Sequence, residues 1–589
     1  MASFSRNPPG KALSLSLKLL RLLAGPWLLA RRVPASPCPR VPASPACGVP
    51  IVRRLASPLL LALAAVGATL GTLGPGVGGP GVTCDELYHV AAGKALVTAL
   101  RHEGFAFFSP RHIAENFDWP ANGPPVQPPL GSWILGWTHY LLDPSPDDPA
   151  VISVAAARFA PAVAFGLLVL LIGWVATRWD GPVAGTVASA ATFFVPRLFG
   201  HAHFAALDML MALGFTAAAL ATAEAVRQGG RWWAMGLAGA VWGLAMLTRL
   251  HGLLLVLPAL AWIVYRLRRR SILPACVWTL AGMATLLAGW PWLWLDPWRR
   301  FWQFAGTGIH RQAVHVFYAG RVWDDRAVPW HYPLVMFVVA LPLGLLLLGG
   351  LGIWSQRPGG RRRDDCLKPG LPAQAAGYRF VLGTLLFVLG VFTLPGMPAY
   401  DGVRLFLMAF PLWALLAGAG ARWLVDHAKL RVWPERRRLW WLGCLVALQA
   451  VGLVVYHPCP LSHYNLLVGG LWGAEKLGFE VTYWGDAVDE SLWQEVAVRA
   501  SGERIVFGPN LAPFQAVGVS FASKSLAEAR VTIVGWDASW RAPPPGCHLG
   551  VFYHRRADLE RILPAIRGGR VVAKRSCQGV WLAEVLEFR

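Results

Sequence analysis

Charged residues are scarce in this chain. Only 15% of its 589 residues are Asp, Glu, Lys or Arg, whereas soluble domains carry roughly 25%. Hydrophobic residues make up 55% of the sequence, and several uncharged runs approach the roughly 20 residues that a helix needs to cross a bilayer. This composition excludes a wholly soluble protein and predicts a membrane protein with many spans.

Acidic residues are fewer than basic ones, at 32 against 54, which leaves a formal net charge of +22. Such an excess can indicate a nucleic-acid partner. Here, however, the basic residues form short clusters between apolar runs, as at 266–270 and 361–363. That pattern is typical of cytoplasmic loops, and no nucleic-acid recognition motif accompanies it. We therefore expect a membrane protein that binds no nucleic acid.

Motifs for metals and nucleotides are also missing. No CxxC pair occurs among the nine cysteines, so a structural zinc site is not expected. The C-terminal segment contains neither a Walker loop nor a GxGxxG turn, so it predicts no nucleotide site and no cofactor. Cys459, Cys547 and Cys577 fall in that segment, where one disulfide is possible, but the sequence does not choose the pair.

Three regions follow from composition. Residues 1–56 are a low-complexity extension in which Val-Pro-Ala-Ser-Pro occurs twice, and such a segment is expected to be disordered. Residues 57–456 hold about eleven apolar runs. Residues 457–589 alternate short strand-like runs with helical stretches, which predicts a small α/β domain. The fold class is therefore mainly α, a polytopic membrane protein with a C-terminal α/β domain. The predicted spans are 57–74, 155–176, 181–197, 205–225, 232–247, 250–266, 272–292, 331–353, 380–395, 404–424 and 439–456.

Basic loops set the predicted orientation. If every run crosses, the basic residues around 227–231, 266–270, 357–379 and 422–438 all fall on one side, which we assign to the cytoplasm together with the N-terminus. The loop 75–154 and the C-terminal domain then lie outside. We expect a multi-pass protein of the plasma or inner membrane with an extracytoplasmic C-terminal domain. This arrangement requires residues 127–142 to lie along the membrane surface.

Two adjacent carboxylates, Asp85 and Glu86, follow the first predicted span. Thr83 and Glu86 have the spacing of a capping box, so Glu86 has a purely structural alternative as a helix cap. Asp85 falls in the first turn, where the helix dipole favours a carboxylate. The functional interpretation is that Asp85 is a general base for an acceptor hydroxyl.

Other charges lie at span ends on the outer side. Asp208 begins a span, and an acid there indicates a functional site unless it merely stabilises the helix start. Arg249 and Arg404 offer guanidinium donors that match phosphate oxygens, although they could also extend toward ordinary lipid headgroups. His201 and His203 are two residues apart and diverge on a helix, so they are weak metal-ligand candidates.

Together these positions resemble the GT-C glycosyltransferases, in the branch of the protein O-mannosyltransferases and the bacterial aminoarabinose–lipid A transferase. No single motif carries the resemblance, which depends on the order and predicted membrane side of several. The C-terminal motifs resemble bacterial members with an extra domain. The motifs are Asp85-Glu86, 127–133 (Gln-Pro-Pro-Leu-Gly-Ser-Trp), Leu207-Asp208-Met209, 248–252 (Thr-Arg-Leu-His-Gly), 402–406 (Gly-Val-Arg-Leu-Phe), 462–470 and 483–486.

The resemblance implies transfer of a sugar from a polyprenyl-phosphate donor to a hydroxyl acceptor on the extracytoplasmic side, with inversion. The sugar, a hexose or a pentose, stays open, and so does the acceptor, which is a lipid, a glycan or a protein. Membrane lipids are the remaining expected partners, and no metal or cofactor is implied. The expected catalytic residues are Asp85 as base, with Glu86 and Asp208, and the expected substrate contacts are Arg249, Arg404, His203 and Gln127.

Two positions depart from the family pattern. The family usually has His before the Pro-Pro pair, where this chain has Gln127. Whatever role the histidine imidazole has in the family, this chain has no imidazole at that position to perform it. The basic residue at position 249 is more often Lys, but Arg still pairs with phosphate.

The main alternative is a multi-span transporter of a lipid-linked or anionic substrate. A carrier is expected to show internal repeats and interrupted spans, and no repeat is visible. A third interpretation is a non-catalytic scaffold, in which the acids are dispensable. Geometry separates these alternatives, because an enzyme needs Asp85, Asp208, Arg249 and Arg404 around one cavity.

Overall fold

The computed structural model describes residues 51–73, 79–117, 127–146, 148, 152–310, 313–357, 371–427, 432–509, 513–537 and 539–588. The predicted extension lies outside the described residues up to Pro50. Helix α2 (Ile51–Leu70) already begins at Ile51, ahead of the expected boundary at 57. The Pro-rich segment 118–126 and the basic cluster 361–363 also lie outside them.

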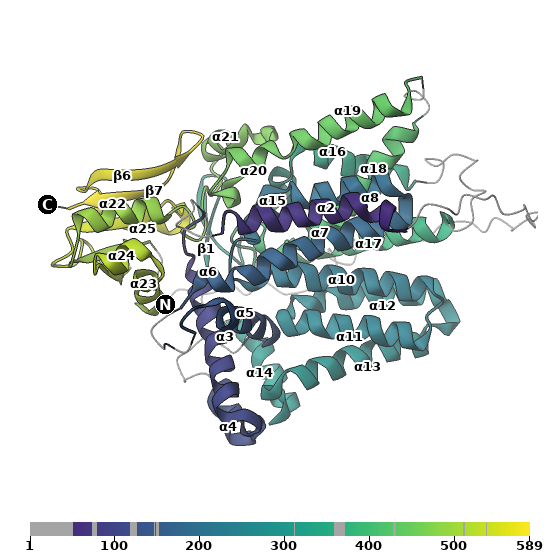
Figure 1. Cartoon of the computed structure of the whole chain (residues 1–589), viewed down its shortest axis with the longest axis horizontal. Coiled ribbons are helices and arrows are strands. Elements are labelled where there is room, and N and C mark those ends of the chain that lie inside the picture. The colour runs from purple at the N-terminus through teal and green to yellow at the C-terminus, as the bar shows by residue number, and fades with distance from the viewer. Residues whose placement is uncertain are drawn as a thin grey trace, which may run out of the picture. The chain divides into compact units, whose positions relative to one another are not determined.

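A first group of apolar helices runs side by side (Figure 1). Small residues allow close approach between them: a Cβ on Gly239 would lie 2.2 Å from the backbone oxygen of Trp278. The indoles of Trp242 and Trp278 stack at this crossing, with ring centroids 4.3 Å apart. The helices are α7 (Phe159–Asp180), α10 (Leu207–Arg227), α11 (Trp232–Thr248), α12 (Val256–Leu267) and α13 (Ile272–Gly289).

A second group packs through glycines as well. A Cβ on Gly420 would lie 1.9 Å from the backbone oxygen of Leu348, so α16 and α18 cross closely. The predicted span 331–353 is broken, because the chain bends by 113° between α15 and α16, next to Pro342. The group comprises α2, α8 (Pro182–Phe193), α15 (Tyr332–Ala340), α16 (Leu343–Ser355), α17 (Leu371–Phe392), α18 (Ala409–Asp426), α19 (Glu435–Leu448) and α20 (Val451–Val455).

The helices are apolar enough for a membrane protein, but the count of about eleven spans is not confirmed. Among the described residues five helices are long and apolar enough to cross, or six if the bent pair α15–α16 is one span. Three shorter apolar helices add to these. The run 181–197 gives only the 12-residue α8, which is shorter than a bilayer crossing requires. The bent pair is the one such break in the described ranges, whereas carriers built from repeats have interruptions at matching positions in both halves.

The segment after the first span forms helices α3 (Cys84–Glu103), α4 (Pro110–Phe117) and α5 (Leu130–Leu142). Helix α3 lies against α5, because Gly93 and Gly136 face each other and a Cβ on either would fall within 2.3 Å of the other helix. With 13 residues, α5 is too short to cross a bilayer.

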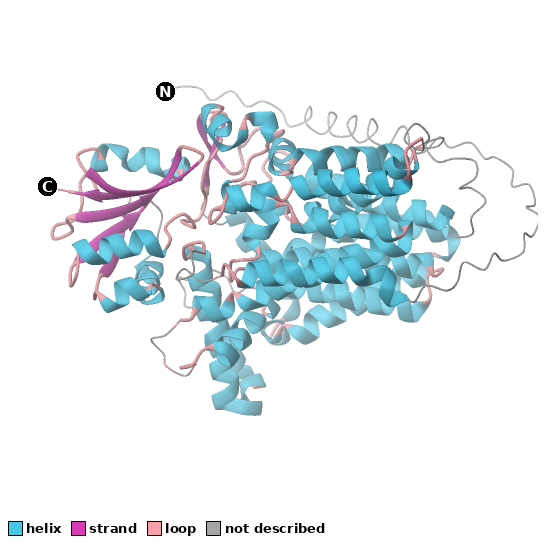
Figure 2. Ribbon diagram, turned by 45° about the horizontal axis from the view of Figure 1, so that its top comes forward, coloured by secondary structure: helices cyan, strands magenta, loops and turns pink. Residues whose placement is uncertain are grey.

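The C-terminal segment forms the expected small sheet domain, with helices on both sides of the sheet (Figure 2). The strand order is β4-β3-β5-β7-β6, with β3 parallel to β4 and β5 and the remaining pairs antiparallel. Cys459, Cys547 and Cys577 are free thiols. The elements are α22 (Glu490–Arg499), β3 (Arg504–Gly508), α23 (Pro513–Ala522), α24 (Lys524–Glu528), β4 (Thr532–Gly535), β5 (Leu549–Tyr553), α25 (Arg556–Ile566), β6 (Arg570–Cys577) and β7 (Val580–Glu587).

This domain touches the start of α3. Gln515 on α23 donates a hydrogen bond of 2.8 Å to the backbone oxygen of Cys84. Gly518 lies against Leu87, since a Cβ at Gly518 would be 2.9 Å from the leucine side chain. A two-stranded hairpin, β1 (His315–Tyr318) with β2 (Arg321–Asp324), contacts α25. The first turn of α3 therefore lies at the junction between the helices and the sheet domain.

Candidate active site

A cavity of about 310 Å³ opens at this junction. It is lined by four of the residues that the sequence singled out: Asp85, Gln127, Arg249 and Arg404. The other lining residues include His89 from α3, Asp401 and Trp484 from two loops, and Arg555 from the C-terminal domain.

Asp85 reaches the cavity because α3 begins immediately before it. Thr83 is the N-cap, and its backbone N–H donates to Glu86 at 2.9 Å, which confirms the predicted capping box. Burial raises the pKa of Asp85, but the Arg404 guanidinium, which donates a hydrogen bond to Asp85, outweighs this and holds the pKa below its usual value. Asp85 is therefore ionised at neutral pH.

Glu86 does not line the cavity, although the sequence made it a catalytic candidate. Its two oxygens accept from Nε and Nη2 of Arg158 at 2.7 and 2.8 Å, and both side chains are fully buried. Its Oε1 also accepts from the backbone N–H of Ala205 at 2.8 Å. Glu86 thus connects the start of α3 to the residues just before α7 and α10. These contacts fit a structural role for Glu86 better than a catalytic one.

This ion pair predicts a stability effect. Glu86→Ala leaves the Arg158 guanidinium buried without its carboxylate, and we expect a loss of about 3–5 kcal/mol in the free energy of unfolding. Glu495→Ala is the matched control, because Glu495 forms an exposed pair with Arg499 on α22 and exposed pairs contribute little. Thermal unfolding of both variants in detergent measures the difference, and equal melting temperatures would contradict this account of Glu86.

Asp208 lies just behind the cavity wall and links the two arginines. Nη1 of Arg249 donates to its Oδ1 at 2.5 Å, and Nε of Arg404 lies 3.3 Å from both of its oxygens. The Asp208 side chain is only 2% exposed. Since Arg404 also contacts Asp85, one guanidinium bridges two of the three carboxylates that the sequence selected.

Asp401 is a functional candidate that sequence reasoning missed. It accepts from Nη1 of Arg404 at 3.3 Å, from the Trp484 indole at 2.9 Å and from Nη2 of Arg555 at 3.1 Å. Its φ of 52° belongs to the tight turn before Gly402. The Trp484 ring covers the Arg404 guanidinium at 4.4 Å, which adds a cation–π contact. Arg404 is therefore held by three carboxylates, Asp85, Asp208 and Asp401, and by the face of the Trp484 ring.

His89 is a further side chain that the sequence did not single out. It lines the cavity, and its Nδ1 has no hydrogen-bond partner among the described residues. Burial lowers the pKa of His89 to about 4, so the ring is neutral at physiological pH. A neutral imidazole with a free nitrogen can donate to or accept from a ligand hydroxyl.

His203, predicted as a substrate contact, does not lie at the cavity. Its ring nitrogens pair with the Thr72 hydroxyl at 2.7 Å and the Phe199 carbonyl at 2.9 Å, and the side chain is buried. It therefore joins α2 to the α9 turn (Pro196–His201). Across the described ranges, no three His, Cys, Asp or Glu side chains are grouped to hold a metal ion.

We compared the sequence with known protein families and the structure with solved structures, and both comparisons gave matches. Residues 126–295 match the family described as dolichyl-phosphate-mannose-protein mannosyltransferase. No curated protein matches the sequence. Among solved structures, ArnT from Cupriavidus metallidurans bound to undecaprenyl phosphate is 14% identical with a TM-score of 0.47, over 91% of this chain and 98% of ArnT. The same protein in the apo state gives 17% and 0.46, over 90% and 97% of the two chains.

The archaeal oligosaccharyltransferase AglB from Archaeoglobus fulgidus, in complex with an inhibitory peptide and a dolichol-phosphate, is 10% identical with a TM-score of 0.43. That match covers 85% of this chain and 69% of AglB. The family match at 126–295 includes Gln127, Asp208 and Arg249 of the candidate site. It confirms the resemblance of this chain to the GT-C glycosyltransferases of the protein O-mannosyltransferase branch.

Proposed function

We propose that this protein is a membrane glycosyltransferase that moves a sugar from a polyprenyl-phosphate donor to a hydroxyl acceptor. The observation that carries the proposal is one cavity lined by an ionised carboxylate, Asp85, and two guanidinium groups, Arg249 and Arg404. The family match supports a lipid-phosphate donor, because its description names a dolichyl-phosphate-linked mannose. The acceptor is a lipid, a glycan or a protein.

In this mechanism Asp85 takes the proton of the acceptor hydroxyl as that oxygen attacks the anomeric carbon. A carbon–oxygen bond forms to the acceptor, and the bond from the anomeric carbon to the phosphate oxygen breaks on the opposite face, which inverts the configuration. The lipid phosphate leaves with the bonding electrons. Arg249, which is half-buried, and Arg404, which is buried, stabilise its growing negative charge at a site partly shielded from water, where such interactions are strong.

Arg404 has a second effect in this scheme. The Arg404 guanidinium donates to both Asp85 and Asp208, and a donor phosphate competes with those carboxylates for it. When the phosphate draws Arg404 toward itself, the pKa of Asp85 rises because its main cationic partner weakens. Donor binding thereby makes Asp85 a stronger base, which favours proton transfer at neutral pH.

The C-terminal domain completes the site. Arg555, the N-cap residue of α25, lines the cavity and holds Asp401, which in turn contacts Arg404. The domain that begins near 457 therefore contributes to the active site through Arg555 rather than serving as a separate module.

Transfer from a panel of radiolabelled polyprenyl-phosphate sugars tests the proposed reaction. Membranes that contain the protein are expected to move label from one donor into a hydroxyl-bearing acceptor fraction, whereas membranes without it do not. If the protein in proteoliposomes instead moves an intact donor across the bilayer and releases no free polyprenyl phosphate, the transporter is the correct function.

The proposed site lies on the extracytoplasmic side, and cysteine labelling tests this. In a cysteine-free background, Ser501→Cys in the exposed turn before β3 is expected to react with a membrane-impermeant maleimide in intact cells. Arg269→Cys in the basic turn Arg268–Arg270, which follows α12, is expected to react only after permeabilisation. The reversed pattern would place the cavity on the cytoplasmic side and contradict the proposed sidedness.

A further inference from the structure

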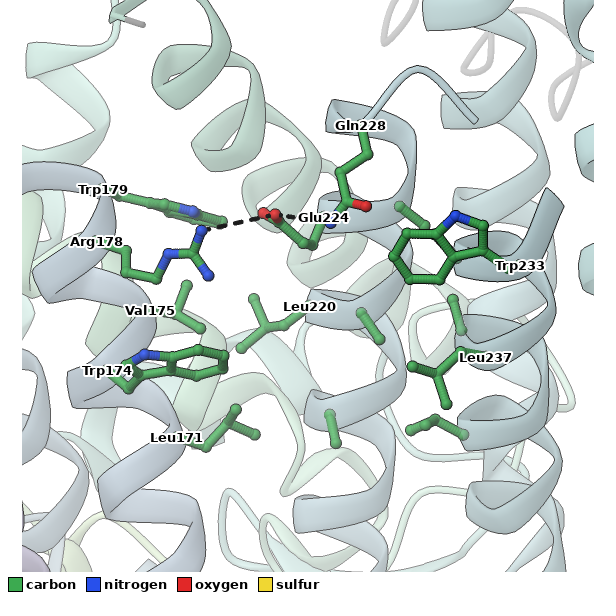
Figure 3. Close-up of a pocket in the computed structure, with 16 residues that line it drawn as sticks. Leu171, Trp174, Val175, Arg178, Trp179, Leu220, Glu224, Gln228, Trp233 and Leu237 are labelled. Atoms are coloured by element: carbon green, nitrogen blue, oxygen red, sulfur yellow. Dashed lines mark hydrogen bonds and ion pairs between the residues drawn. The ribbon is translucent and has the colours of Figure 1, made fainter. Parts of the chain in front are cut away.

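A second cavity, of about 300 Å³, lies between α7, α10 and α11. Figure 3 shows its walls, which are formed by apolar side chains such as Leu171, Leu220 and Leu237, with the indoles of Trp174 and Trp233 on either side. Both α7 and α10 are long and apolar enough to cross a membrane. The groove is therefore formed by spanning helices, at a depth where hydrocarbon rather than water is the neighbour.

This groove is remote from the candidate active site. Asp208 begins α10 beside the first cavity, and Glu224 lies near the other end of the same helix, at the groove. At 1.5 Å per residue the two carboxylates are separated by about 24 Å along the helix. That distance approaches the thickness of the hydrocarbon core, so a polar group at Glu224 lies toward the opposite face of the membrane.

One end of the groove is polar and basic. Glu224 accepts from Arg227 at 2.6 Å and from Gln228 at 3.1 Å, while Nη2 of Arg178 approaches it at 3.8 Å. Two guanidinium groups thus face one carboxylate, which leaves a net positive charge. The Arg178 side chain is 48% exposed and lies 5.5 Å from the Trp174 ring. Arg266 adds a further positive charge, since it lines an adjoining small pocket together with Glu224 and Arg227.

We propose that this groove binds an acyl chain of an anionic glycerophospholipid, with the phosphodiester of that lipid against Arg178. The walls are apolar and only one end is polar, which fits an amphiphile with a single headgroup. Guanidinium groups pair well with phosphate oxygens. The Trp174 ring lies beside Arg178 at the polar end of the groove, and a tryptophan next to a basic residue is typical of the membrane interface. The volume is at the lower end for a ligand pocket, so the groove holds one chain and leaves the second in the bilayer. The site is independent of the proposed sugar transfer.

Native mass spectrometry of the full chain in detergent tests the headgroup. We expect phosphatidylglycerol to bind at least tenfold more tightly than phosphatidylcholine, and Arg178→Gln to reduce the affinity for phosphatidylglycerol by at least tenfold. Arg422→Gln is the matched control, because Arg422 forms a similarly exposed pair with Asp426 on α18. Equal losses in the two variants, or no preference for phosphatidylglycerol, would overturn the proposal.

Photocrosslinking tests the groove itself and does not depend on a substitution. A phosphatidylglycerol with a diazirine in one acyl chain is expected to label peptides of α7, α10 and α11 around Leu171, Leu220 and Leu237. Excess unlabelled phosphatidylglycerol is expected to reduce this labelling, whereas excess polyprenyl phosphate is expected to leave it unchanged. Labelling confined to other helices would overturn the proposal, and equal competition by polyprenyl phosphate would identify the donor lipid, not a glycerophospholipid, as the occupant.

Discussion

Asp85→Asn is expected to lower the rate of sugar transfer by about a thousandfold. General-base catalysis contributes roughly two to four orders of magnitude, and an amide at this position cannot accept the proton of the acceptor hydroxyl. Asparagine keeps the size of the side chain and its place in the first turn of α3. Binding of polyprenyl phosphate is therefore expected to be retained, and a transfer assay alongside a phosphate-binding assay measures the two effects separately.

Asp537→Asn is the matched control for this variant, because Asp537 is exposed in the C-terminal domain and caps only its own turn through Ser539. It is expected to transfer sugar at the wild-type rate. Near-normal turnover by Asp85→Asn would remove Asp85 from the mechanism.

The pH dependence provides a second test of the same base. Because Arg404 lowers the pKa of Asp85 in the free protein, kcat/KM is expected to stay constant from neutral pH down to below the ordinary aspartate value of about 3.9. Since the donor phosphate draws Arg404 away, the acid limb of kcat is expected at higher pH than that of kcat/KM. The kcat/KM profile reports the free enzyme and the kcat profile reports the bound complex. Coincident acid limbs in the two profiles would therefore contradict the competition for Arg404.

Arg404→Ala is expected to reduce kcat/KM by about two to three orders of magnitude, the usual effect of removing one donor that stabilises a developing anion. The affinity for the donor is expected to fall more than the affinity for the acceptor, because the phosphate rather than the acceptor pairs with the guanidinium. Arg404→Lys is expected to recover only part of the activity, since an ammonium group lacks the planar set of donors that reaches Asp85, Asp208 and Asp401 together.

Arg499→Ala is the matched control for Arg404, because it removes a half-exposed guanidinium from the surface of α22. Binding titrations with polyprenyl phosphate and with the acceptor separate the two affinities. An equal loss of both in Arg404→Ala would indicate a collapsed cavity instead of a lost phosphate contact.

Local sequence patterns predicted the parts of this site that depend on neighbouring residues. The capping box needs only the three-residue spacing from Thr83 to Glu86 and therefore identified the start of α3. Arg249 and Arg404 were recognisable because arginine is unexpected at the outer edge of a span. The resemblance to a known family then placed both beside Asp85, and the structure brings these three residues to one cavity.

Partners that are distant in sequence were not predictable from it. Arg158 neutralises Glu86 from 72 residues away, and Arg555 reaches Asp401 across 154 residues. Nothing local distinguishes either arginine from other basic residues. His203 was misplaced for the same reason, because its hydroxyl partner Thr72 lies 131 residues earlier. The count of about eleven spans is not confirmed for a different reason: apolar runs such as 181–197 show hydrophobicity, but not how short the helix within them is.

The position of the lipid phosphate is the most direct test of a shared cavity for the base and the two arginines. A cryo-electron microscopy structure of the protein with polyprenyl phosphate provides this measurement. The phosphate is expected within hydrogen-bond distance of Arg249 and Arg404, with the Asp85 carboxylate on the open side of the same cavity. A phosphate bound elsewhere, with the cavity empty at saturating lipid, would contradict it.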